Sequence, residues 1–259
     1  MSYLESLFSL DKKVSIVTGA AGGNGKSISE SLLRSGSTVV MVDISKKKLL
    51  KVVKEFQDKD LPAIEYHCDI TNKSQILKLG KYIKKKFNKL DILINNAGIS
   101  LPKSSLDYSE KLWEKTYNIN VKAPFFLSQE CAKIMKQKKS GIIINITSIN
   151  AEFAFPDNPS YQASKGGLKQ LTKSLALDLA KFGIRVNNVG PGYFQTAMTK
   201  KSWDNIEKRK KISNNTILGR WGEPRDLQGI IILLASDASS YITGQDFYID
   251  GGWSIKGLK

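Results

Sequence analysis

Cysteine and histidine are scarce in this chain, which narrows the chemistry that it can perform. Its 259 residues include two cysteines and one histidine, and no Cys-x-x-Cys pair is present. Zinc sites and disulfide frameworks need more of these side chains, so we expect neither. Ser-His-Asp catalysis would have to use His67 alone. We therefore expect a reduced protein of the cytoplasm that holds no metal.

Long apolar runs are also missing. No segment approaches the roughly 18 apolar residues that a membrane helix needs. The first residues, MSYLESLFSLDKK, place no basic region before an apolar stretch, so we expect no signal peptide. Hydrophobic residues still make up 41% of the chain, enough for a large core. These features predict a globular protein without a membrane partner.

Arginine is rare, although the net charge is +16. Only five of the 40 basic residues are arginine, the side chain best suited to bidentate contacts with bases and phosphates. The lysines are spread along the chain in short clusters on expected helices. This pattern favours solvated helix faces over a nucleic-acid surface. We expect no nucleic-acid partner and keep nucleic-acid binding as the alternative.

Short apolar segments alternate with helical patterns along the whole chain. Such strands, buried on both faces and separated by helices, are typical of a parallel sheet with right-handed crossovers. We predict one α/β domain over residues 1–259, doubly wound and of Rossmann type, with a seven-stranded, mostly parallel sheet and helices on both faces. The expected strands are 13–18, 38–43, 63–69, 90–98, 141–148, 183–192 and 246–252. The expected helices include 24–35, 72–88, 109–137, 159–181 and 224–235.

A glycine-rich turn, TGAAGGNGKSI, follows the first expected strand at residues 18–28. Gly19, Gly23 and Gly25 allow positive φ angles and a close approach of the backbone to a ligand. The helix that follows offers free N–H groups and a positive dipole end, which suit a pyrophosphate. A simple tight turn is the alternative. The position of the turn, between a strand and a helix, favours a dinucleotide site.

Asp43 ends the second expected strand, 24 residues beyond Gly19 (43 − 19). A carboxylate there can accept hydrogen bonds from both hydroxyls of an adenosine ribose and would repel a 2′-phosphate. This favours NAD over NADP. The alternative role is that of an N-cap for the helix beginning near Ser45. The lysines at 46–48 could weaken the preference for NAD.

The third and fourth expected strands also end in residues suited to a dinucleotide. Asp69 could bond the adenine amino group, with Ile70 contacting the ring, or could cap the helix at 72–88. The segment NNAG at 95–98 could tie neighbouring loops together, and Gly98 would allow close approach. The alternative for NNAG is an ordinary turn.

Tyr161 and Lys165 share one helix face, because they are four residues apart. A nearby ammonium group would lower the pKa of the phenol, which would suit Tyr161 to proton transfer near neutral pH. Ser148 ends the fifth expected strand and could bond the substrate oxygen. Asn120, on the helix after the fourth strand, could hold a water beside Lys165. Each of these residues is common, so their combination carries the hypothesis.

The chain resembles the short-chain dehydrogenase/reductase family over nearly its whole length. The resemblance rests on Thr18-Gly19-x-x-x-Gly23-x-Gly25, Asp69, Asn95-Asn96-Ala97-Gly98, Asn120, Ser148, Tyr161-x-x-x-Lys165 and Pro191-Gly192, which occur in the family's order and spacing. It implies a catalytic tetrad of Asn120, Ser148, Tyr161 and Lys165. In the family this lysine also bonds the nicotinamide ribose.

The same resemblance implies a bound nicotinamide dinucleotide. The implied contacts are Gly19, Gly23, Asn24, Gly25, Asp43, Asp69, Ile70, Asn96, Ala97, Gly98, Tyr161, Lys165, Pro191, Gly192 and Thr196. NAD is again favoured over NADP, because Gly22 stands where many NADP-using members carry a basic residue. Family members are mostly homotetramers, so we expect a homotetramer or homodimer. Helices 109–137 and 159–181 would form one interface, and the last strand with helix 224–235 would form another.

A substrate lid is expected at about 192–215. Its segment 199–211 holds six basic and two acidic residues, which could attract an anionic substrate or could simply form a solvated helix. The segment that follows Ser148 could reach into the pocket with the side chains of Asn150, Glu152 and Phe153.

Segments PGYFQTAMT and LGRWGEPRDL are similar to those of gluconate 5-dehydrogenases and related sugar-acid dehydrogenases. The expected reaction is therefore NAD(H)-dependent interconversion of a secondary alcohol and a ketone on a sugar, polyol or sugar acid, with Tyr161 as general acid and base. One alternative is a 3-oxoacyl-thioester (acyl-carrier-protein) reductase using NADPH. The other is a dinucleotide-binding protein without catalysis.

Overall fold

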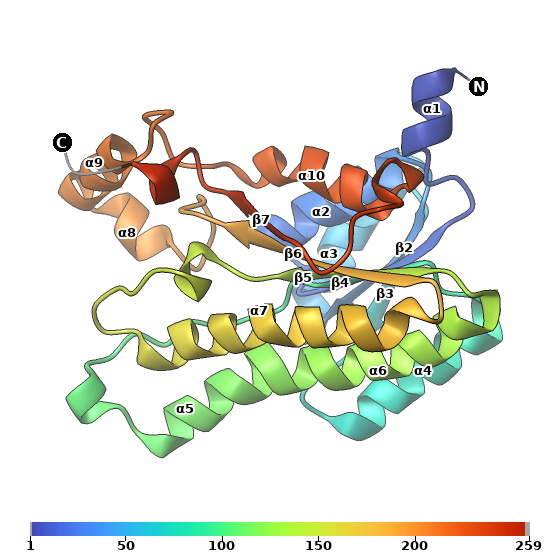
Figure 1. The fold of residues 1–259 in the computed structure, drawn as a ribbon, viewed down its shortest axis with the longest axis horizontal. Helices are drawn as coiled ribbons and strands as arrows, with labels where there is room; N and C mark the ends of the chain where they lie inside the picture. Colours follow the sequence, from blue (N-terminus) through green and yellow to red (C-terminus); the bar gives the residue numbers. More distant parts are fainter. Residues whose placement is uncertain (1, 257–259) are drawn as a thin grey trace.

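Seven parallel strands form one sheet at the centre of the computed structural model, which describes residues 2–256 (Figure 1). Their order is β3-β2-β1-β4-β5-β6-β7, and every neighbouring pair is parallel. The strands are β1 (Val14–Thr18), β2 (Thr38–Asp43), β3 (Ala63–His67), β4 (Ile92–Asn95), β5 (Gly141–Ile146), β6 (Ile184–Pro191) and β7 (Asp246–Ile249). The order reverses between β1 and β4, so ligands are expected at the carboxyl ends of these strands.

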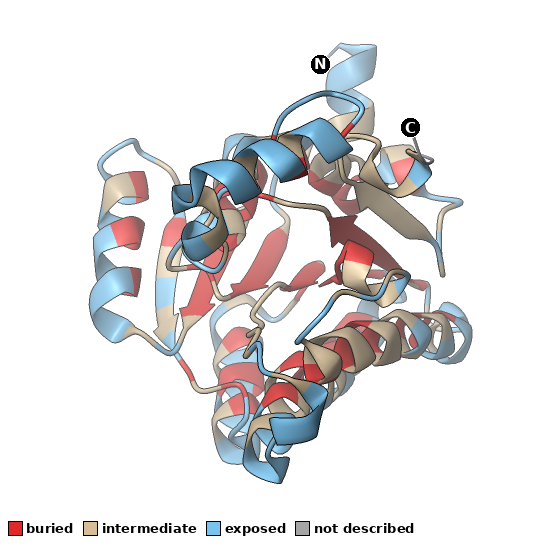
Figure 2. Cartoon of the chain, turned by 90° about the vertical axis from the view of Figure 1, so that its left-hand side faces the viewer, coloured by how far each residue is buried: buried red, intermediate tan, exposed pale blue. Residues whose placement is uncertain are grey.

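Helices cover both faces of the sheet (Figure 1). The bounds are α2 (Gly23–Arg34), α3 (Lys46–Gln57) and α10 (Gln228–Ala235) on one face, and α4 (Lys73–Phe87), α5 (Glu110–Tyr117), α6 (Ala123–Met135) and α7 (Pro159–Ala180) on the other. Figure 2 shows the strands buried between these layers and the outer helix faces exposed. This arrangement confirms the predicted doubly wound fold.

Alternate residues of the central strands feed two separate cores. In β5, Ile142, Ile144 and Ile146 belong to the core beneath α2, α3 and α10. Ile143, between them, belongs to the core beneath α4, α6 and α7. Because side chains of a strand alternate between the two faces, a strand covered on both sides must be apolar throughout. The run of isoleucines in β5 follows from this geometry.

One expected helix differs from the prediction. The segment 109–137 was expected as one regular helix, but a π-helical turn at Asn118–Lys122 separates α5 from α6. π-helical turns insert an extra residue into a helix and occur frequently at functional sites. This one carries Asn120, one of the predicted catalytic residues.

The structure contains two further features outside the sheet and its covering helices. A short helix that was not predicted, α1 (Tyr3–Phe8), has no buried residue and projects from the body of the molecule (Figure 1). The expected lid segment forms α8 (Lys200–Asp204) and α9 (Ile206–Asn215). Across residues 2–256, no helix has the length and apolar character needed to span a membrane.

Candidate active site

A cleft of about 470 Å³ opens at the carboxyl ends of the central strands. Its walls come from the glycine loop, the ends of β2, β4, β5 and β6, and helix α7. The cleft is lined by most of the predicted site residues: Gly19, Gly23, Asn24, Gly25, Asp43, Asn96, Ala97, Gly98, Ser148, Tyr161, Lys165, Pro191, Gly192 and Thr196. Three predicted residues, Asp69, Ile70 and Asn120, lie outside this lining.

The glycine loop leaves no space for side chains at two of its positions. A Cβ atom at Gly25 would overlap the carbonyl oxygen of Gly19 and lie 2.6 Å from Asn96 Nδ2. Gly19 itself has φ +64° and faces the backbone of Ala97. By contrast, a Cβ atom at Gly22 would meet nothing within 4 Å. The glycines therefore hold the loop against the end of β4 and leave open space at Gly22.

The start of α2 fits the phosphates of a dinucleotide. No side chain caps the first turn of this helix, which begins at Gly23, so its N–H groups and dipole end are available to an anion. Asn24, on the same turn, has a buried Oδ1 atom with no hydrogen-bond partner among the described residues. A buried oxygen without a donor is costly, and a bound dinucleotide could supply that donor.

Thr18 fastens the glycine loop to the end of β4. Its hydroxyl oxygen accepts hydrogen bonds from the backbone N–H groups of Asn96 and Ala97, each at 3.1 Å. The Asn96 Nδ2 amide donates to the carbonyl oxygens of Thr18 at 2.9 Å and of Gly19 at 3.3 Å. The NNAG segment therefore ties neighbouring loops together, as one of its two predicted roles required.

Asp43 is fixed at the rim of the cleft by two backbone donors. Its Oδ2 accepts from the N–H of Ala21 at 3.0 Å, and its Oδ1 accepts from the N–H of Ser45 at 2.8 Å. The N-cap of α3 is Ser45 and no side chain caps this helix, so the structure does not place Asp43 in its alternative role as the N-cap. Lys48 also lines this part of the cleft.

Asp69 and Ile70 contact other parts of the protein outside the cleft lining. The Asp69 carboxylate accepts hydrogen bonds from the N–H and the hydroxyl of Thr71, at 2.9 and 2.7 Å. Ile70 belongs to the core beneath α4. The cap of α4 is Asn72, whose side chain accepts from the N–H groups of Ser74 and Gln75. The structure therefore does not place Asp69 in its alternative role as the cap of this helix.

Tyr161 and Lys165 line the inner end of the cleft from α7. Lys165 is 4% exposed, its Nζ donates to the carbonyl oxygen of Ile146 at 2.7 Å, and burial lowers its pKa to about 8. The Nζ atom lies 5.6 Å from the centre of the Tyr161 ring. Burial raises the pKa of Tyr161, and the neighbouring Ser148 hydroxyl partly lowers it.

The electrostatics of this pair differ from the prediction. We expected Lys165 to lower the pKa of Tyr161, but the buried surroundings of the phenol dominate and raise it. The same burial penalises the ammonium form of Lys165. The sequence pattern identified the pair, but it contained no measure of how far both groups are removed from water.

Ser148 leaves β5 directly into a 3-10 turn, η4 (Ile149–Ala151), and caps it. Its hydroxyl donates to Asn150 Oδ1 at 3.1 Å and accepts from the Asn150 N–H at 3.2 Å. Asn150 was predicted to reach into the pocket, and it instead holds Ser148.

Asn120 lies behind the cleft wall. Its amide exchanges two hydrogen bonds with the backbone of Ile99, both at 2.9 Å, and donates to Ser164 Oγ at 3.0 Å. A Cβ atom at Gly98 would lie 3.2 Å from Asn120 Oδ1 and 3.5 Å from Lys165 Nζ. Asn120 and Lys165 therefore approach the same backbone segment, although Asn120 is fully buried.

A connected group of six aromatic residues lies outside the cleft lining, and of these only Phe153 was predicted as a site residue. A chain of aromatic contacts, with ring centres 5.2–6.3 Å apart, joins the loop after η4, the segment after β6, the lid and the C-terminal turn. Its members are Phe153, Phe155, Tyr193, Trp203, Trp221 and Trp253. Phe153 was predicted to enter the pocket, and it stacks edge-on against Trp253 at 5.5 Å. No fixed spacing links these residues in the sequence.

Comparison with known proteins gives consistent matches over the full site. A family model described as Enoyl-(Acyl carrier protein) reductase matches residues 19–254. The 3-oxoacyl-(acyl-carrier-protein) reductase of Thermotoga maritima is 37% identical over 95% of this chain and 99% of its own length. Gluconate 5-dehydrogenase of Gluconobacter oxydans is 35% identical over 96% of this chain and 97% of its own.

A solved structure of a related protein also matches this chain over nearly its whole length. The crystal structure of a gluconate 5-dehydrogenase from Burkholderia cenocepacia, in complex with NADP and tartrate, superposes with a TM-score of 0.95 at 30% identity. The match covers 98% of this chain and all of the other. Sequence and structure therefore indicate an oxidoreductase that acts on CH–OH groups with NAD(P). The chain belongs to the short-chain dehydrogenase/reductase family.

Proposed function

We propose that this protein is an NAD(H)-dependent dehydrogenase that interconverts a secondary alcohol and a ketone on a sugar acid or a related sugar or polyol. One observation carries the proposal. A single cleft has Asp43 and the glycine loop at one end and Ser148, Tyr161 and Lys165 at the other. The first end has the donors and acceptors for a dinucleotide, and the second has groups that can move a proton.

Tyr161 is proposed as the general acid and base. A bound nicotinamide dinucleotide supplies the hydride acceptor or donor for this reaction. During alcohol oxidation the phenolic oxygen of Tyr161 takes the substrate hydroxyl proton, and during ketone reduction it returns a proton to the carbonyl oxygen. Since burial raises its pKa, the protonated form dominates at neutral pH and suits reduction. Oxidation needs the proton to leave, so it is favoured by higher pH.

Ser148 and Lys165 are proposed to assist this proton transfer. The Ser148 hydroxyl stabilises the ionised phenol, because it lowers the pKa of Tyr161 against the effect of burial. Its second proposed task is to bond the substrate oxygen. Lys165 lies within 5.6 Å of the Tyr161 ring centre and, when charged, would favour the phenolate. Asn120 is proposed to hold the backbone beside Lys165 through its two bonds to Ile99.

The choice of NAD over NADP is proposed from Asp43. Its carboxylate is held at the cleft rim by Ala21 and Ser45, where a ribose 2′-phosphate would meet its negative charge. Lys48 lines the same region and is the residue that favours NADP. Thermal-shift titrations with NAD and NADP test this directly. A larger shift with NADP at equal concentration would contradict the proposal.

Two further properties are proposed with the reaction. The segment 192–215 serves as a substrate lid, because α8 begins directly after Thr196 and Thr199 in the cleft wall. The chain forms a single domain and assembles as a homotetramer or homodimer, since α7 exposes Leu177 (82%) and α5 exposes Trp113 (41%) in one copy. Light scattering coupled to size exclusion measures the assembly, and a monomeric mass at micromolar concentration would refute it.

The substrate class rests on the relatives and on the charge of the lid. Several similar proteins are named for gluconate or its keto derivatives, and α8 places Lys200 and Lys201 beside the cleft segment that ends at Thr199. Lys200 pairs with Asp204 within α8, so the exposed Lys201 is the lysine proposed to attract a carboxylate-bearing substrate. The second candidate is reduction of a 3-oxoacyl thioester with NADPH, favoured by the Thermotoga maritima relative.

A substrate panel separates these candidates. Sugar acids, keto sugar acids, polyols and 3-oxoacyl thioesters are each assayed with NAD(H) and NADP(H) by absorbance at the reduced nicotinamide band. We expect the highest kcat/KM for a sugar acid with NAD. Preference for an acyl thioester with NADPH would establish the second candidate. Tight dinucleotide binding without turnover of the panel would instead favour a non-catalytic binding protein.

A further inference from the structure

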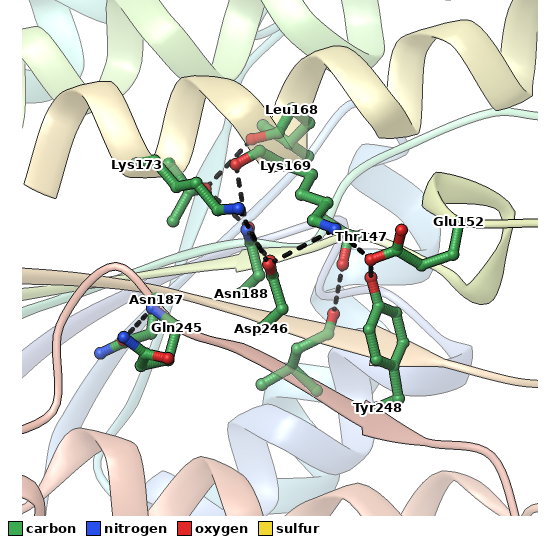
Figure 3. A network of polar contacts seen from close by, with 12 residues as sticks. Thr147, Glu152, Leu168, Lys169, Lys173, Asn187, Asn188, Gln245, Asp246 and Tyr248 are labelled. Carbon is green, nitrogen blue, oxygen red and sulfur yellow. Dashed lines mark hydrogen bonds and ion pairs between the residues drawn. The ribbon is translucent and has the colours of Figure 1, made fainter. Parts of the chain in front are cut away.

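Glu152 was predicted to enter the substrate pocket, but its carboxylate points to two other elements (Figure 3). Its Oε1 atom accepts a hydrogen bond and ion pair from Lys169 Nζ of α7. The same oxygen accepts from the hydroxyl of Tyr248 in β7 at 2.7 Å. Glu152 comes directly after η4, the turn that Ser148 caps. One carboxylate thus joins the Ser148 turn, the helix of Tyr161 and the last strand.

A second carboxylate, that of Asp246 in β7, also forms an ion pair with Lys169. Asp246 Oδ2 lies 3.7 Å from Lys169 Nζ and 3.7 Å from Lys173 Nζ, and its Oδ1 accepts from Asn188 Nδ2 at 2.7 Å. The side chains of Asp246 and Lys169 are 16% and 21% exposed. Two acids and two lysines therefore balance in charge within a chain that carries a net charge of +16. Basic residues outnumber acidic ones by 40 to 24 in this chain, and the cluster contains two of the acidic ones.

Tyr248 connects this cluster to the end of β6. A Cβ atom at Gly190 would lie 2.6 Å from two ring carbons of Tyr248 and 3.3 Å from Thr147 Oγ1. The ring therefore rests on the Gly190 backbone, one residue before Pro191 in the cleft wall. The Thr147 N–H donates to the carbonyl oxygen of Val189 at 2.8 Å. The tyrosine ring thus packs on β6 next to the end of β5 that leads into Ser148.

Lys169 links the Glu152 carboxylate to α7. It lies four residues after Lys165 and eight after Tyr161, so the three side chains follow one face of the helix. The helix is held at Lys165 by the carbonyl of Ile146 and at Thr172 by hydrogen bonds with Asn145 and Asn188. The η4 turn contacts α7, and the Lys169–Glu152 pair adds a charged link between the end of this turn and the helix.

We propose that Glu152, Lys169 and Tyr248 form a positioning cluster that sets the Ser148 hydroxyl against the Tyr161 phenol. This proposal rests on the proposed function, in which Ser148 and Tyr161 act on the substrate. None of the three residues touches the reacting atoms, because Glu152 and its partners lie outside the cleft lining. They act through the position of the η4 turn. The pKa of the Glu152 carboxyl is lowered by Lys169 and Tyr248, which keeps the carboxylate charged at neutral pH.

Three variants test the cluster: Glu152→Gln, Lys169→Met and Tyr248→Phe. A displacement of about 1 Å in a catalytic group can cost up to about 100-fold in rate, so we expect each variant to lower kcat by roughly tenfold. The Kd for NADH, measured by fluorescence titration, should stay within about twofold, since the glycine loop is untouched. In the double variant Glu152→Gln/Lys169→Met, kcat should fall by roughly tenfold and not about 100-fold, because both changes break one interaction.

Two readouts distinguish positioning from a general loss of stability. Displacing Ser148 removes its lowering of the Tyr161 pKa, so the pH profile for alcohol oxidation should shift to higher pH in all three variants. Hydrogen exchange should increase in residues 149–155 and stay unchanged in the glycine loop at 19–25. Glu130→Gln, which removes a carboxylate paired with Lys133 on α6, is the matched control and should leave all of these quantities unchanged.

The outcomes separate this inference from the proposed function. If the wild-type protein turns over no substrate, the proposed function fails, and hydrogen exchange still tests whether the cluster holds the η4 turn. If the wild type is active but the variants keep its kcat, pH profile and exchange pattern, the positioning cluster is refuted. Multiplicative losses in the double variant would also overturn it, since Glu152 and Lys169 would then act independently.

Discussion

The dinucleotide end and the substrate end of the cleft are built in different ways. The dinucleotide end depends on backbone: Gly19 and Gly25 allow close contacts, and Thr18 bonds the N–H groups at the end of β4. The substrate end depends on side chains from distant segments, such as Glu152 with Tyr248, 96 residues apart. Backbone constraints leave fixed motifs in a sequence, whereas long-range side-chain contacts leave none. If the two ends are separable, a variant at one end should leave the function of the other end unchanged.

Tyr161→Phe should give the largest effect and should separate the two ends most clearly. The variant removes the only phenolic oxygen in the cleft lining and keeps the ring. General acid–base catalysis contributes about 10²–10⁴-fold, so kcat should fall by that order. The Kd for NAD(H), measured by calorimetry, should change by less than about threefold, because one hydrogen bond contributes little net free energy.

An equal loss of dinucleotide affinity in Tyr161→Phe would show that the two ends are not independent. The variant also tests the role of the phenol itself. If it kept the wild-type kcat, Tyr161 would not be the acid and base. Gln170→Ala, at an exposed position of the same helix, provides the control for changes in α7 and should leave both kcat and Kd unchanged.

Gly25→Ala and Gly22→Ala form a matched pair at the dinucleotide end. The first places a methyl group against the Gly19 carbonyl and Asn96, while the second meets nothing within 4 Å. We expect Gly25→Ala to weaken NAD(H) binding by about 100-fold and to lower the free energy of unfolding by about 1–3 kcal/mol through overpacking. Gly22→Ala should bind within about threefold of the wild type, provided the methyl group stays clear of the pyrophosphate.

Calorimetry and chemical denaturation measure both quantities for this pair. Similar losses in the two variants would mean that the open space at Gly22 is needed by the cofactor. Similar small effects would mean that the loop can move away from Asn96. In either case the contrast between constrained and free glycines would not hold.

The sequence predicted most of the fold and most of the residues that line the cleft. The seven strands were placed to within a few residues, because buried parallel strands are apolar throughout, as the isoleucines of β5 illustrate. The glycine loop, Asp43, Ser148, Tyr161 and Lys165 all reach the cleft, since each follows a strand or lies on the helix beside it. These placements depend on short-range patterns that a sequence can display.

Other features could not be predicted, for physical reasons. The π-helical turn at Asn118–Lys122 arises from packing between α5, α6 and α7, and no local residue type specifies it. The orientation of Glu152 depends on Tyr248, whose strand is placed only by the tertiary fold. The sign of the Tyr161 pKa shift follows from burial of the phenol, which the motif alone does not reveal.

Asp43→Asn and Asp69→Asn compare two carboxylates that sequence reasoning assigned to the same cofactor. Asp43 lines the cleft, whereas Asp69 bonds Thr71 and lies outside the lining. We expect Asp43→Asn to weaken NAD binding by about tenfold and to improve NADP binding, because charge-assisted bonds to the ribose are worth about 1.5–3 kcal/mol. Asp69→Asn should change either Kd by less than about threefold.

Titration of both variants with NAD and NADP decides this comparison. A larger loss in Asp69→Asn would place that carboxylate on the adenine after all. An unchanged NAD/NADP ratio in Asp43→Asn would show that this carboxylate does not control the choice between the two dinucleotides.

The titration of Lys165 should give the smallest effect, a change in the free energy of unfolding with pH. Burial lowers its pKa from 10.5 to about 8 in the folded protein, so between pH 8 and 10.5 the unfolded chain binds more protons than the folded one. The free energy of unfolding therefore rises with pH in this window, and the gain attributable to Lys165 should be about 2 kcal/mol between pH 8 and 10.

Comparison with Lys165→Met isolates this contribution. The variant removes the titrating group and keeps an apolar stem of similar length, so the difference in unfolding free energy between wild type and variant should shift in favour of the wild type as the pH rises. Denaturant titrations at pH 7, 8, 9 and 10 measure it. Tyr161 works in the opposite direction above pH 10, because its folded pKa is raised, so the range is kept below that value. A constant difference across the range would mean that water reaches the ammonium group, and then burial would not control the proton chemistry at the substrate end of the cleft.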